Sequence, residues 1–413
     1  MPGRMGGGSK RRNDRSIMEL ALRSTLIFSI IGFLVNFGLG TVAPILPLYA
    51  LTFNVSIVMV GALVSASAIS KVILDMPSGI VADRLGTKRF MLGGLLIVAA
   101  SAMISAFAVD YWMLLIGLTV QGIGSAIYFT TSYLGISRTA PPAKRGRHLG
   151  LFISLQFLGT TSGPVLGGLI GQAYGLSGPF LIYAAFTLIS AAMVYFLVSG
   201  ASIKGAGGAS VDLHQITRTF RNYTLTSVNA GLFTTSILRA GLVSTIVPLF
   251  AVRNLGLTTV ELGAALTLSA GFNFLSLLPA SSLSDRLGRK PFLFSSLLFG
   301  GIVAAMIPLA TDLLTFAVIM SALGFALGLS GSVGAYVTDV APPPDLGGAM
   351  GIFRTMGDLG SFIGPIILTA FIPASAGPIN ASPFLVAGMI LSVSGLLLIP
   401  AKDPVRSKAG GRK

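Results

Sequence analysis

Five charged side chains stand inside long apolar stretches of this 413-residue chain, where a charge is costly. A charged side chain at the centre of a bilayer costs about 3 kcal/mol on insertion scales, so each such group should face a partner or a wet cavity. Carboxylates in such a place can pair with cations and bind protons reversibly, which makes them candidates for gating and for proton coupling. The five charges are Lys71, Asp75, Arg239, Arg354 and Asp358.

Four of these charges form two spaced pairs. Lys71 lies four positions before Asp75, and Arg354 lies four positions before Asp358, so each pair shares one face of its helix. Each pair could neutralise itself within its own helix, or the two pairs could meet across the molecule. Arg239 has no acidic partner at such a spacing, so it either binds an anionic or polar ligand or is satisfied by backbone carbonyls.

Long apolar helices must position these charges. Hydrophobic residues make up 53% of the chain and charged residues 10%, and the mean hydropathy is +0.85, which is too apolar for a soluble protein of this length. A hydrocarbon core of about 30 Å needs about 20 residues per helix. We therefore predict an all-α integral membrane protein with twelve transmembrane helices, at residues 22–50, 57–82, 90–109, 111–137, 149–174, 180–199, 223–251, 259–284, 291–310, 312–338, 348–372 and 382–401.

The basic residues, which give a net charge of +15, gather at both ends of the chain and in alternate loops. The opposite set of loops carries essentially one basic residue, Arg253. This asymmetry follows the positive-inside rule and predicts a multi-pass protein of the plasma or inner cell membrane with both termini in the cytoplasm. The lipid bilayer is the expected partner. Because the basic residues form no single stripe, we expect no nucleic acid.

The chain contains an internal duplication. GIVADRLGTKR at 79–89 is repeated as SSLSDRLGRK at 281–290, which places Asp83 and Asp285 202 positions apart. At nearly the same offset, Pro47-Leu48-Tyr49 matches Pro248-Leu249-Phe250, and Gly163-Pro164 matches Gly364-Pro365. Duplicated halves are typical of membrane transporters. The predicted organisation is a cytoplasmic basic tail (1–21), a six-helix bundle (22–199), a cytoplasmic linker with a short amphipathic helix (200–222), a second six-helix bundle (223–401) and a second cytoplasmic basic tail (402–413).

The repeated turn resembles the signature loop of the major facilitator superfamily, which has the form G-x-L-x-D-R-x-G-R-K between the second and third helices. Small residues allow close packing and tight turns, and the acid can interact with a helix N-terminus. Thr87 stands where the family has arginine, and Ser281 replaces the first glycine of the second copy, so the halves are related but not equivalent. The matching positions are Gly79, Asp83, Arg84, Gly86, Lys88, Asp285, Arg286, Gly288, Arg289 and Lys290.

A second segment is similar to the G-x-x-x-G-P-x-x-G-G pattern in the fifth helix of that family's twelve-helix drug:proton antiporters. Glycines at this spacing allow close helix contact, and a proline bends the helix. Ordinary glycine packing is the alternative interpretation. Leu118 occupies the place of an arginine linked with proton transfer in that group, so this chain must couple elsewhere or not couple to protons. The motif residues are Gly159, Gly163, Pro164, Gly167 and Gly168.

The resemblance implies two bundles that rock around a central site, with the second and eleventh helices in contact between the halves. On that basis we hypothesise two crossed pairs, Asp75 with Arg354 and Lys71 with Asp358, which lock the cytoplasmic side in the outward-open state. Polar residues on helices that line the cavity in relatives are candidates for substrate contact, although interhelical hydrogen bonds would also explain them. These candidates are Asn36, Gln121, Tyr128, Gln156, Arg239 and Asn273.

The resulting expectation is a monomeric secondary active transporter that works by alternating access and exports amphipathic small molecules in exchange for protons. A sugar or metabolite exporter or uniporter without proton coupling is the main alternative, and a non-transporting membrane sensor or scaffold is a further one. With no cysteine and only two histidines, both in predicted cytoplasmic segments, the chain offers no metal site or hydrolytic triad. We expect no cofactor and no enzymatic activity.

Overall fold

The computed structural model describes residues 7–141, 144–198, 220–342, 346–373 and 377–405. Within these ranges the chain is helical and contains no strands. The first half consists of α1 (Gly7–Val42), α2 (Leu46–Leu51), α3 (Ile57–Leu85), α4 (Thr87–Ala106), α5 (Tyr111–Thr139), α6 (Arg145–Tyr174) and α7 (Gly178–Leu197).

The second half repeats this order with more interruptions. It consists of α9 (Tyr223–Ile237), the π-helix η3 (Leu238–Ile246), α10 (Val247–Arg253), α11 (Thr259–Leu287), α12 (Arg289–Met306), η4 (Ile307–Leu309), α13 (Leu313–Gly328), η5 (Leu329–Ser332), α14 (Val333–Val340), α15 (Leu346–Ala370) and α16 (Ser382–Leu397). Most of the predicted linker, residues 200–219, lies outside the described residues.

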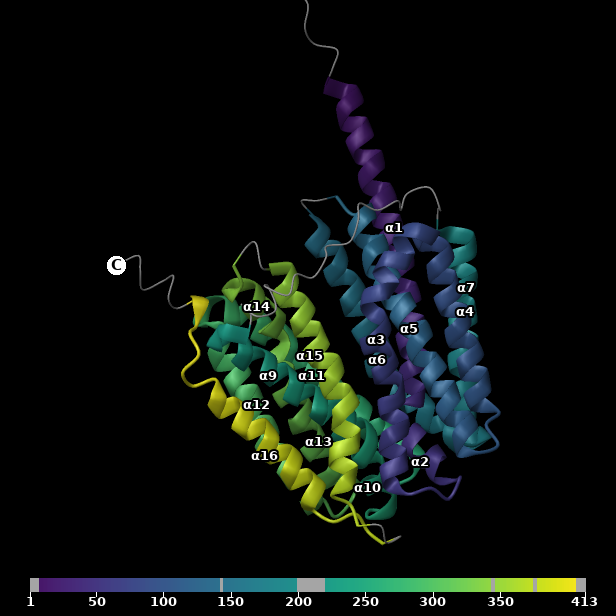
Figure 1. The fold of residues 1–413 in the computed structure, drawn as a ribbon, viewed down its shortest axis with the longest axis vertical. Coiled ribbons are helices and arrows are strands. Elements are labelled where there is room, and N and C mark those ends of the chain that lie inside the picture. Colours follow the sequence, from purple (N-terminus) through teal and green to yellow (C-terminus); the bar gives the residue numbers. More distant parts are fainter. Residues whose placement is uncertain (1–6, 142–143, 199–219, 343–345, 374–376, 406–413) are drawn as a thin grey trace, which may run out of the picture.

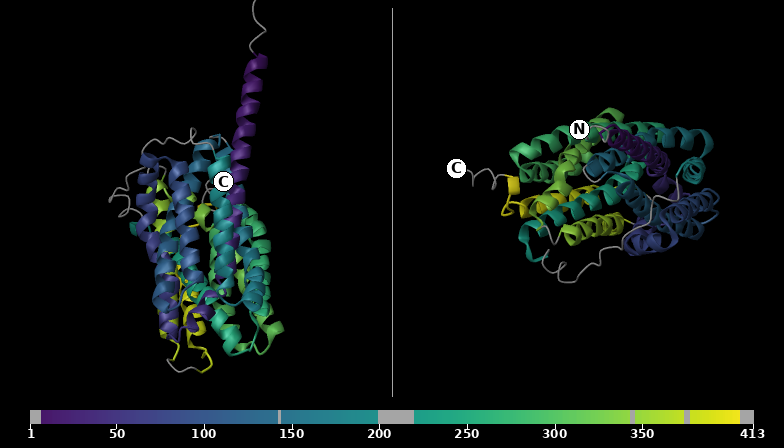
Figure 2. Two further views of the ribbon diagram at one scale, coloured as in Figure 1. Left: turned by 90° about the vertical axis from the view of Figure 1, so that its right-hand side faces the viewer. Right: turned by 90° about the horizontal axis from the view of Figure 1, so that it is seen from above.

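Ten of the described segments are long and apolar enough to cross a membrane, and α16 is a shorter apolar helix. Helix α15 packs against α3 and α9 and completes the second set of six. The prediction of an all-α membrane protein is confirmed. Figure 1 shows the two sets of helices as two groups, and the view from above in Figure 2 separates them again.

Each half has its own buried core. In the first half, Phe28, Tyr128 and Phe152 are almost fully buried, and in the second half Phe316 and Phe384 are. Because lipid is as apolar as leucine, the helices within each core are held by close packing and hydrogen bonds. The halves therefore behave as two packed units, and the contact between them is the place to look for a site.

Several predicted spans differ from the observed helices. The first predicted span, 22–50, is two helices, because α1 ends at Val42 and α2 begins after Pro44. The predicted start of the third span at residue 90 is wrong by three positions, since Gly86 ends α3 and α4 begins directly after it. The seventh span contains a nine-residue π-helix and the tenth a short 3₁₀ segment, neither of which the apolar pattern predicts.

The duplication extends to helix starts. Asp110 and Asp312 are the residues before α5 and α13, and each carboxylate accepts a hydrogen bond from the backbone three residues later. Such N-caps satisfy one of the free N–H groups of the first turn. Equivalent positions in the two halves thus cap equivalent helices.

Candidate functional site

The two copies of the repeated turn have the same backbone geometry. Gly86 and Gly288 each join two helices with positive φ, at 86° and 108°, a region that favours glycine. Lys88 donates to the carbonyl of Tyr195 at 2.8 Å, and Lys290 donates to that of Ile399 at 2.5 Å. Lys88 therefore connects its turn to α7, and Lys290 connects its turn to the residues that follow α16. We call the end of the molecule where these turns lie the turn end, and the end with α2 and α10 the far end.

The residues that follow the two turn glycines, Thr87 and Arg289, make different contacts with a neighbouring helix. Arg289 pairs with Asp285 on α11 and, at 3.0 Å, with Asp339 on α14. In the first half the corresponding Thr87 accepts a hydrogen bond of 2.9 Å from Arg138 on α5. The arginine missing from the first copy is thus replaced by one on the partner helix. Arg84 and Arg286 are exposed, and the contacts predicted for Gly79 and Asp83 lie outside the side chains that the structure describes.

Three glycines of the α6 motif pack on α1. A β-carbon added to any of them would lie within 2.6 Å of a backbone atom of α1. Gly159 faces Phe33, Gly163 faces Phe37 and Gly40, and Gly167 faces Thr41. Spaced four residues apart, they form one flat stripe on the helix. In the second half, Gly360 and Gly364 face the backbone of Phe233 and Ile237 in the same way. The α6 motif is therefore first of all a helix-packing motif, and it exists in both halves.

The fourth motif glycine and the proline contact the other half. A β-carbon on Gly168 would lie 2.2 Å from the carbonyl oxygen of Thr259, and one on Gly263 would lie 2.4 Å from that of Pro164. The backbone N–H of Val165 donates to the Thr267 hydroxyl at 3.2 Å. These contacts join α6 to α11, and all of them lie toward the far end.

The contact of α3 with α15 mirrors that of α6 with α11. A β-carbon on Gly61 would lie 2.7 Å from the carbonyl oxygen of Pro365, as Gly263 faces Pro164. Ser65 donates to the carbonyl of Phe362 at 2.5 Å one turn further along. The halves therefore meet along two pseudo-symmetric seams, α3 with α15 and α6 with α11, and each has a glycine against the carbonyl of a proline.

Toward the turn end, the α3–α15 seam carries the charged residues. Arg354 and Asp75 form an ion pair of 2.7 Å between Nη2 and Oδ2, with 48% and 18% of the side chains exposed. No ion pair of the described residues joins Lys71 to Asp358, although their charges attract each other. The Lys71 ammonium lies 5.8 Å from the centre of the Phe129 ring. Of the two crossed pairs, the structure holds the first and brings the second only near.

The ion pair forms in a structure whose halves also touch at the far end. Gly61 and Gly263 are pressed against the opposite half while Asp75 and Arg354 are paired. The sequence-based hypothesis places the pair in an outward-open state, whereas here it accompanies an arrangement closed at both ends of the α3–α15 seam. Asp75, Arg354 and Asp358 line a cavity of about 450 Å³ at the turn end of this seam.

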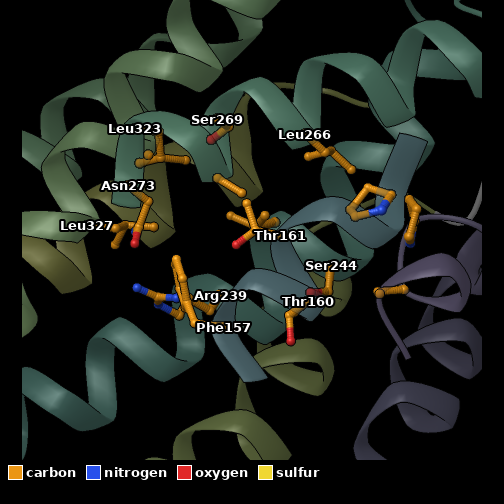
Figure 3. Close-up of a pocket in the computed structure, with 17 residues that line it drawn as sticks. Phe157, Thr160, Thr161, Arg239, Ser244, Leu266, Ser269, Asn273, Leu323 and Leu327 are labelled. Atoms are coloured by element: carbon orange, nitrogen blue, oxygen red, sulfur yellow. The ribbon is translucent and has the colours of Figure 1, made fainter. Parts of the chain in front are cut away.

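A cavity of about 200 Å³ lies between the halves at the level of the α6 motif (Figure 3). Arg239 from η3, Asn273 from α11 and Phe157 from α6 line it, with mostly small or apolar neighbours. The Arg239 side chain is exposed to this cavity. No hydrogen bond or ion pair joins its guanidinium to any residue that the structure describes. The amide oxygen of Asn273 is buried and also accepts no hydrogen bond within the described chain.

A second cavity of about 270 Å³ adjoins the first and is lined mainly by residues of the N-terminal half. Lys71, Leu118 and Gln121 line it, and Ala43, Thr160 and Ser244 line both cavities. Gln121 donates to Ser125 at 3.1 Å and to Tyr183 at 3.3 Å, so its amide is already held in place. Leu118 is almost fully buried. Each cavity thus contains one cation and, among the described residues, no carboxylate.

Three predicted cavity residues do not line either cavity. Asn36 donates to the carbonyl of Gly32 at 2.9 Å and accepts a hydrogen bond from Thr160, which makes it an interhelical link between α1 and α6. Tyr128 and Gln156 are buried in the N-terminal half. The structure supports an interhelical hydrogen bond at Asn36, whereas Arg239, Asn273 and Gln121 do reach a cavity.

Sequence reasoning missed several lining residues. Thr160 and Thr161 lie inside the α6 motif, at positions that its pattern leaves open and about one turn before Pro164. Ser244 lies five residues after Arg239, a spacing that an α-helix would not place on one face. The π-helix η3 widens the turn there, with Thr245 donating to the carbonyl five residues back. Such segments often occur at functional sites.

Comparison with known proteins agrees with this architecture. The model of the Major Facilitator Superfamily matches residues 28–223 and 228–413. The chain is 26% identical over 381 residues to a multi-drug resistance efflux pump PmrA homolog of Lactococcus lactis (87% of this chain, 91% of that protein). It is 23% identical over 389 residues to the quinolone resistance protein NorA of Staphylococcus aureus (91% and 95%).

Solved structures share the fold. The nucleoside transporter NupG superposes with a TM-score of 0.74 at 16% identity, covering 91% of this chain and 99% of NupG. The peptide transporter POT superposes with a TM-score of 0.76 at 14% identity, covering 93% and 97%. From the family match along nearly the whole chain, the duplicated seams and the cavity between them, this protein is a small-molecule transporter, not an enzyme, and belongs to the major facilitator superfamily.

Proposed function

We propose that this protein is a secondary active transporter that exports amphipathic small molecules by alternating access, in exchange for protons. The observation that carries the proposal is the cavity between the halves, flanked by two pseudo-symmetric seams. A site at the interface of two repeats is the arrangement that alternating access requires. The mostly apolar lining suits an amphipathic molecule.

In the proposed cycle, contacts at the two ends of the seams break and form again in turn. At the far end the halves touch through close backbone contacts, at Gly61 with Pro365 and Gly263 with Pro164, and through hydrogen bonds such as that of Thr259 to the carbonyl of Gly168. Among the described residues no ion pair has to break there. At the turn end the Asp75–Arg354 ion pair has to break. Opening one end while the other stays closed would expose the cavity to one side at a time.

Proton coupling is proposed for Asp75 and Asp358. The charged groups that face this pair of carboxylates are Arg354, with which Asp75 pairs, and Lys71, whose charge attracts both. Protonation of Asp75 would remove one partner of the ion pair and weaken the turn end of the seam. This arrangement offers a route for coupling that does not depend on an arginine at Leu118.

A test is to reconstitute the purified protein in liposomes with an imposed pH gradient. A panel of amphipathic cations, acids and neutral compounds is added, and proton movement is followed with a pH dye inside the vesicles. We expect at least one compound to drive proton movement in wild-type vesicles. We expect Asp75→Asn and Asp358→Asn to transport without moving protons or not at all. Normal proton-linked transport in both variants would exclude the proposed coupling route.

Uniport or export of a sugar or metabolite without proton coupling is the second candidate. It is favoured by Leu118, which lines the second cavity where the antiporter pattern has arginine. Substrate flux that ignores the imposed pH gradient in the same vesicles would select this candidate. For either function we propose the plasma or inner membrane, with both termini in the cytoplasm, and a monomer as the working unit.

A further inference from the structure

We infer that the substrate carries an acidic group, a carboxylate or a similar anion, that binds Arg239 in the cavity between the halves. This inference rests on the proposed transport function and names the chemical class of its substrate. The central observation is an arginine that faces a cavity from the middle of a membrane-spanning segment and forms no hydrogen bond or ion pair with any described residue. A charge in that position is costly unless a ligand or water satisfies it.

Among the described residues, the lining of the cavity around Arg239 contains no acidic side chain. The side chains of Phe157, Leu323 and Leu327 are apolar, and Ser244 and Ser269 are neutral. The acidic residues of the α3–α15 seam, Asp75 and Asp358, line the separate cavity at the turn end. The adjoining second cavity adds another cation, Lys71. The electrostatic potential of the central space is therefore positive, which favours an anion and disfavours a cation.

The geometry around Arg239 suits a carboxylate. A guanidinium presents parallel N–H donors that match the two oxygens of a carboxylate. The buried Asn273 amide lies on the same cavity and has an unused oxygen, so a hydroxyl or N–H group of the ligand could bind it (Figure 3). The rest of the lining, with Phe157 and leucines, would hold an apolar body. The structure thus assigns an amphipathic organic acid as the preferred substrate.

The test measures equilibrium binding to purified protein in detergent, with no gradient. Three probes share one aromatic body and differ only in the head group: 1-naphthylacetate, its neutral primary amide and 1-naphthylmethylammonium. We expect the acid to bind wild-type protein about tenfold or more tightly than the amide, as a charge-assisted pair of hydrogen bonds implies, and the ammonium to bind most weakly. Equal binding of acid and amide, tighter binding of the ammonium, or no binding of any probe would overturn the inference.

The variants Arg239→Gln and Arg239→Lys assign the preference to this residue. We expect Arg239→Gln to lose about tenfold for the acid but nothing for the amide, and Arg239→Lys to retain part of the preference. Arg253→Gln, on α10 and outside both cavities, is the matched control and should bind like wild type. An acid preference that survives in Arg239→Gln would refute the role of Arg239. If Arg239→Gln does not fold, the lysine variant and the three wild-type affinities still decide.

Failure of this inference and failure of the proposed transport are distinguishable. Gradient-driven transport of cations by a protein that binds the ammonium best would leave the transport function standing and overturn the substrate class. Arg239-dependent binding of the acid without any gradient-driven flux would support the substrate class and overturn the proposed transport.

Discussion

Arg354 on α15 and Asp75 on α3 form an ion pair of 2.7 Å across the contact between the two halves. The two residues come from opposite halves and lie 279 positions apart in the chain. In the same structure the halves also touch at the far end, through Gly61 and Gly263. The pair joins the turn end of the α3–α15 seam, whereas Gly61 and Gly263 close the far ends of the two seams, so the two ends of the molecule can be perturbed separately.

Charge exchange should test the ion pair directly. Asp75→Arg alone would place two cations together at the turn end of the seam, and we expect it to reduce substrate flux in liposomes by about tenfold or more, since like charges at close range repel. The double variant Asp75→Arg with Arg354→Asp restores opposite charges and should recover part of the flux. Arg221→Gln, an exposed residue before α9, serves as the control. Equal loss in the single and double variants would show that the pair does not act as a gate.

A methyl group at Gly263 should open the far end. The added β-carbon would lie 2.4 Å from the carbonyl oxygen of Pro164, so the α6–α11 seam must widen or the fold must lose about 1–3 kcal/mol from overpacking. Gly271→Ala on the same helix is the matched control, because a β-carbon there meets nothing within 4 Å.

Opening of the far end in Gly263→Ala can be measured by cysteine labelling, because the sequence contains no cysteine of its own. A cysteine introduced at Ala43, which lines both cavities, can be labelled with a membrane-impermeant maleimide added on the far side. We expect faster labelling in Gly263→Ala, or a lower thermal midpoint, and neither in Gly271→Ala. Unchanged labelling and stability in Gly263→Ala would contradict the close contact.

The arginine lies on the neighbouring helix in the first half, at Arg138, and on the turn in the second half, at Arg289. This difference predicts that two substitutions in the first half should compensate each other. Thr87→Arg alone would bring an arginine beside Arg138 and should lower the thermal midpoint, because Thr87 is almost fully buried and the charges repel. Thr87→Arg with Arg138→Asp recreates the Arg289–Asp339 arrangement of the second half and should recover most of the loss. A double-mutant cycle on thermal unfolding measures the coupling, and a coupling near zero would refute the equivalence of the two turns.

The N-cap Asp312 predicts a pH dependence of stability. The backbone N–H of Thr315 holds the pKa of this exposed carboxyl below its ordinary value. A lowered folded-state pKa stabilises the protein above the unfolded pKa of about 4, and this stabilisation is lost as the pH falls through the folded value. Asp312→Ala should therefore lower the thermal midpoint at pH 7, with a smaller difference below pH 4. A difference that does not change between pH 7 and pH 3 would count against the cap.

Much of the fold could be predicted because its causes are local. Apolar stretches of about 20 residues must be helical in a bilayer, and a repeated turn at an offset of 202 residues implies two related halves. The same local logic identified Gly86 and Gly288 as turn residues, and both have positive φ. The π-helix η3 escaped prediction because nothing in the types of residues 238–246 distinguishes its wider turn from an α-helix.

The sequence by itself determined which charges are unusual and that the helices come in two sets of six. It did not determine which of those charges meet, because an i,i+4 spacing allows pairing within a helix as well as across the seam. Only the tertiary structure paired Asp75 with Arg354, placed Arg239 on a cavity with no partner among the described residues, and showed that Asn36 links α1 to α6. The physical reason is that helix formation depends on neighbours in the chain, whereas partners and cavities depend on how distant helices pack.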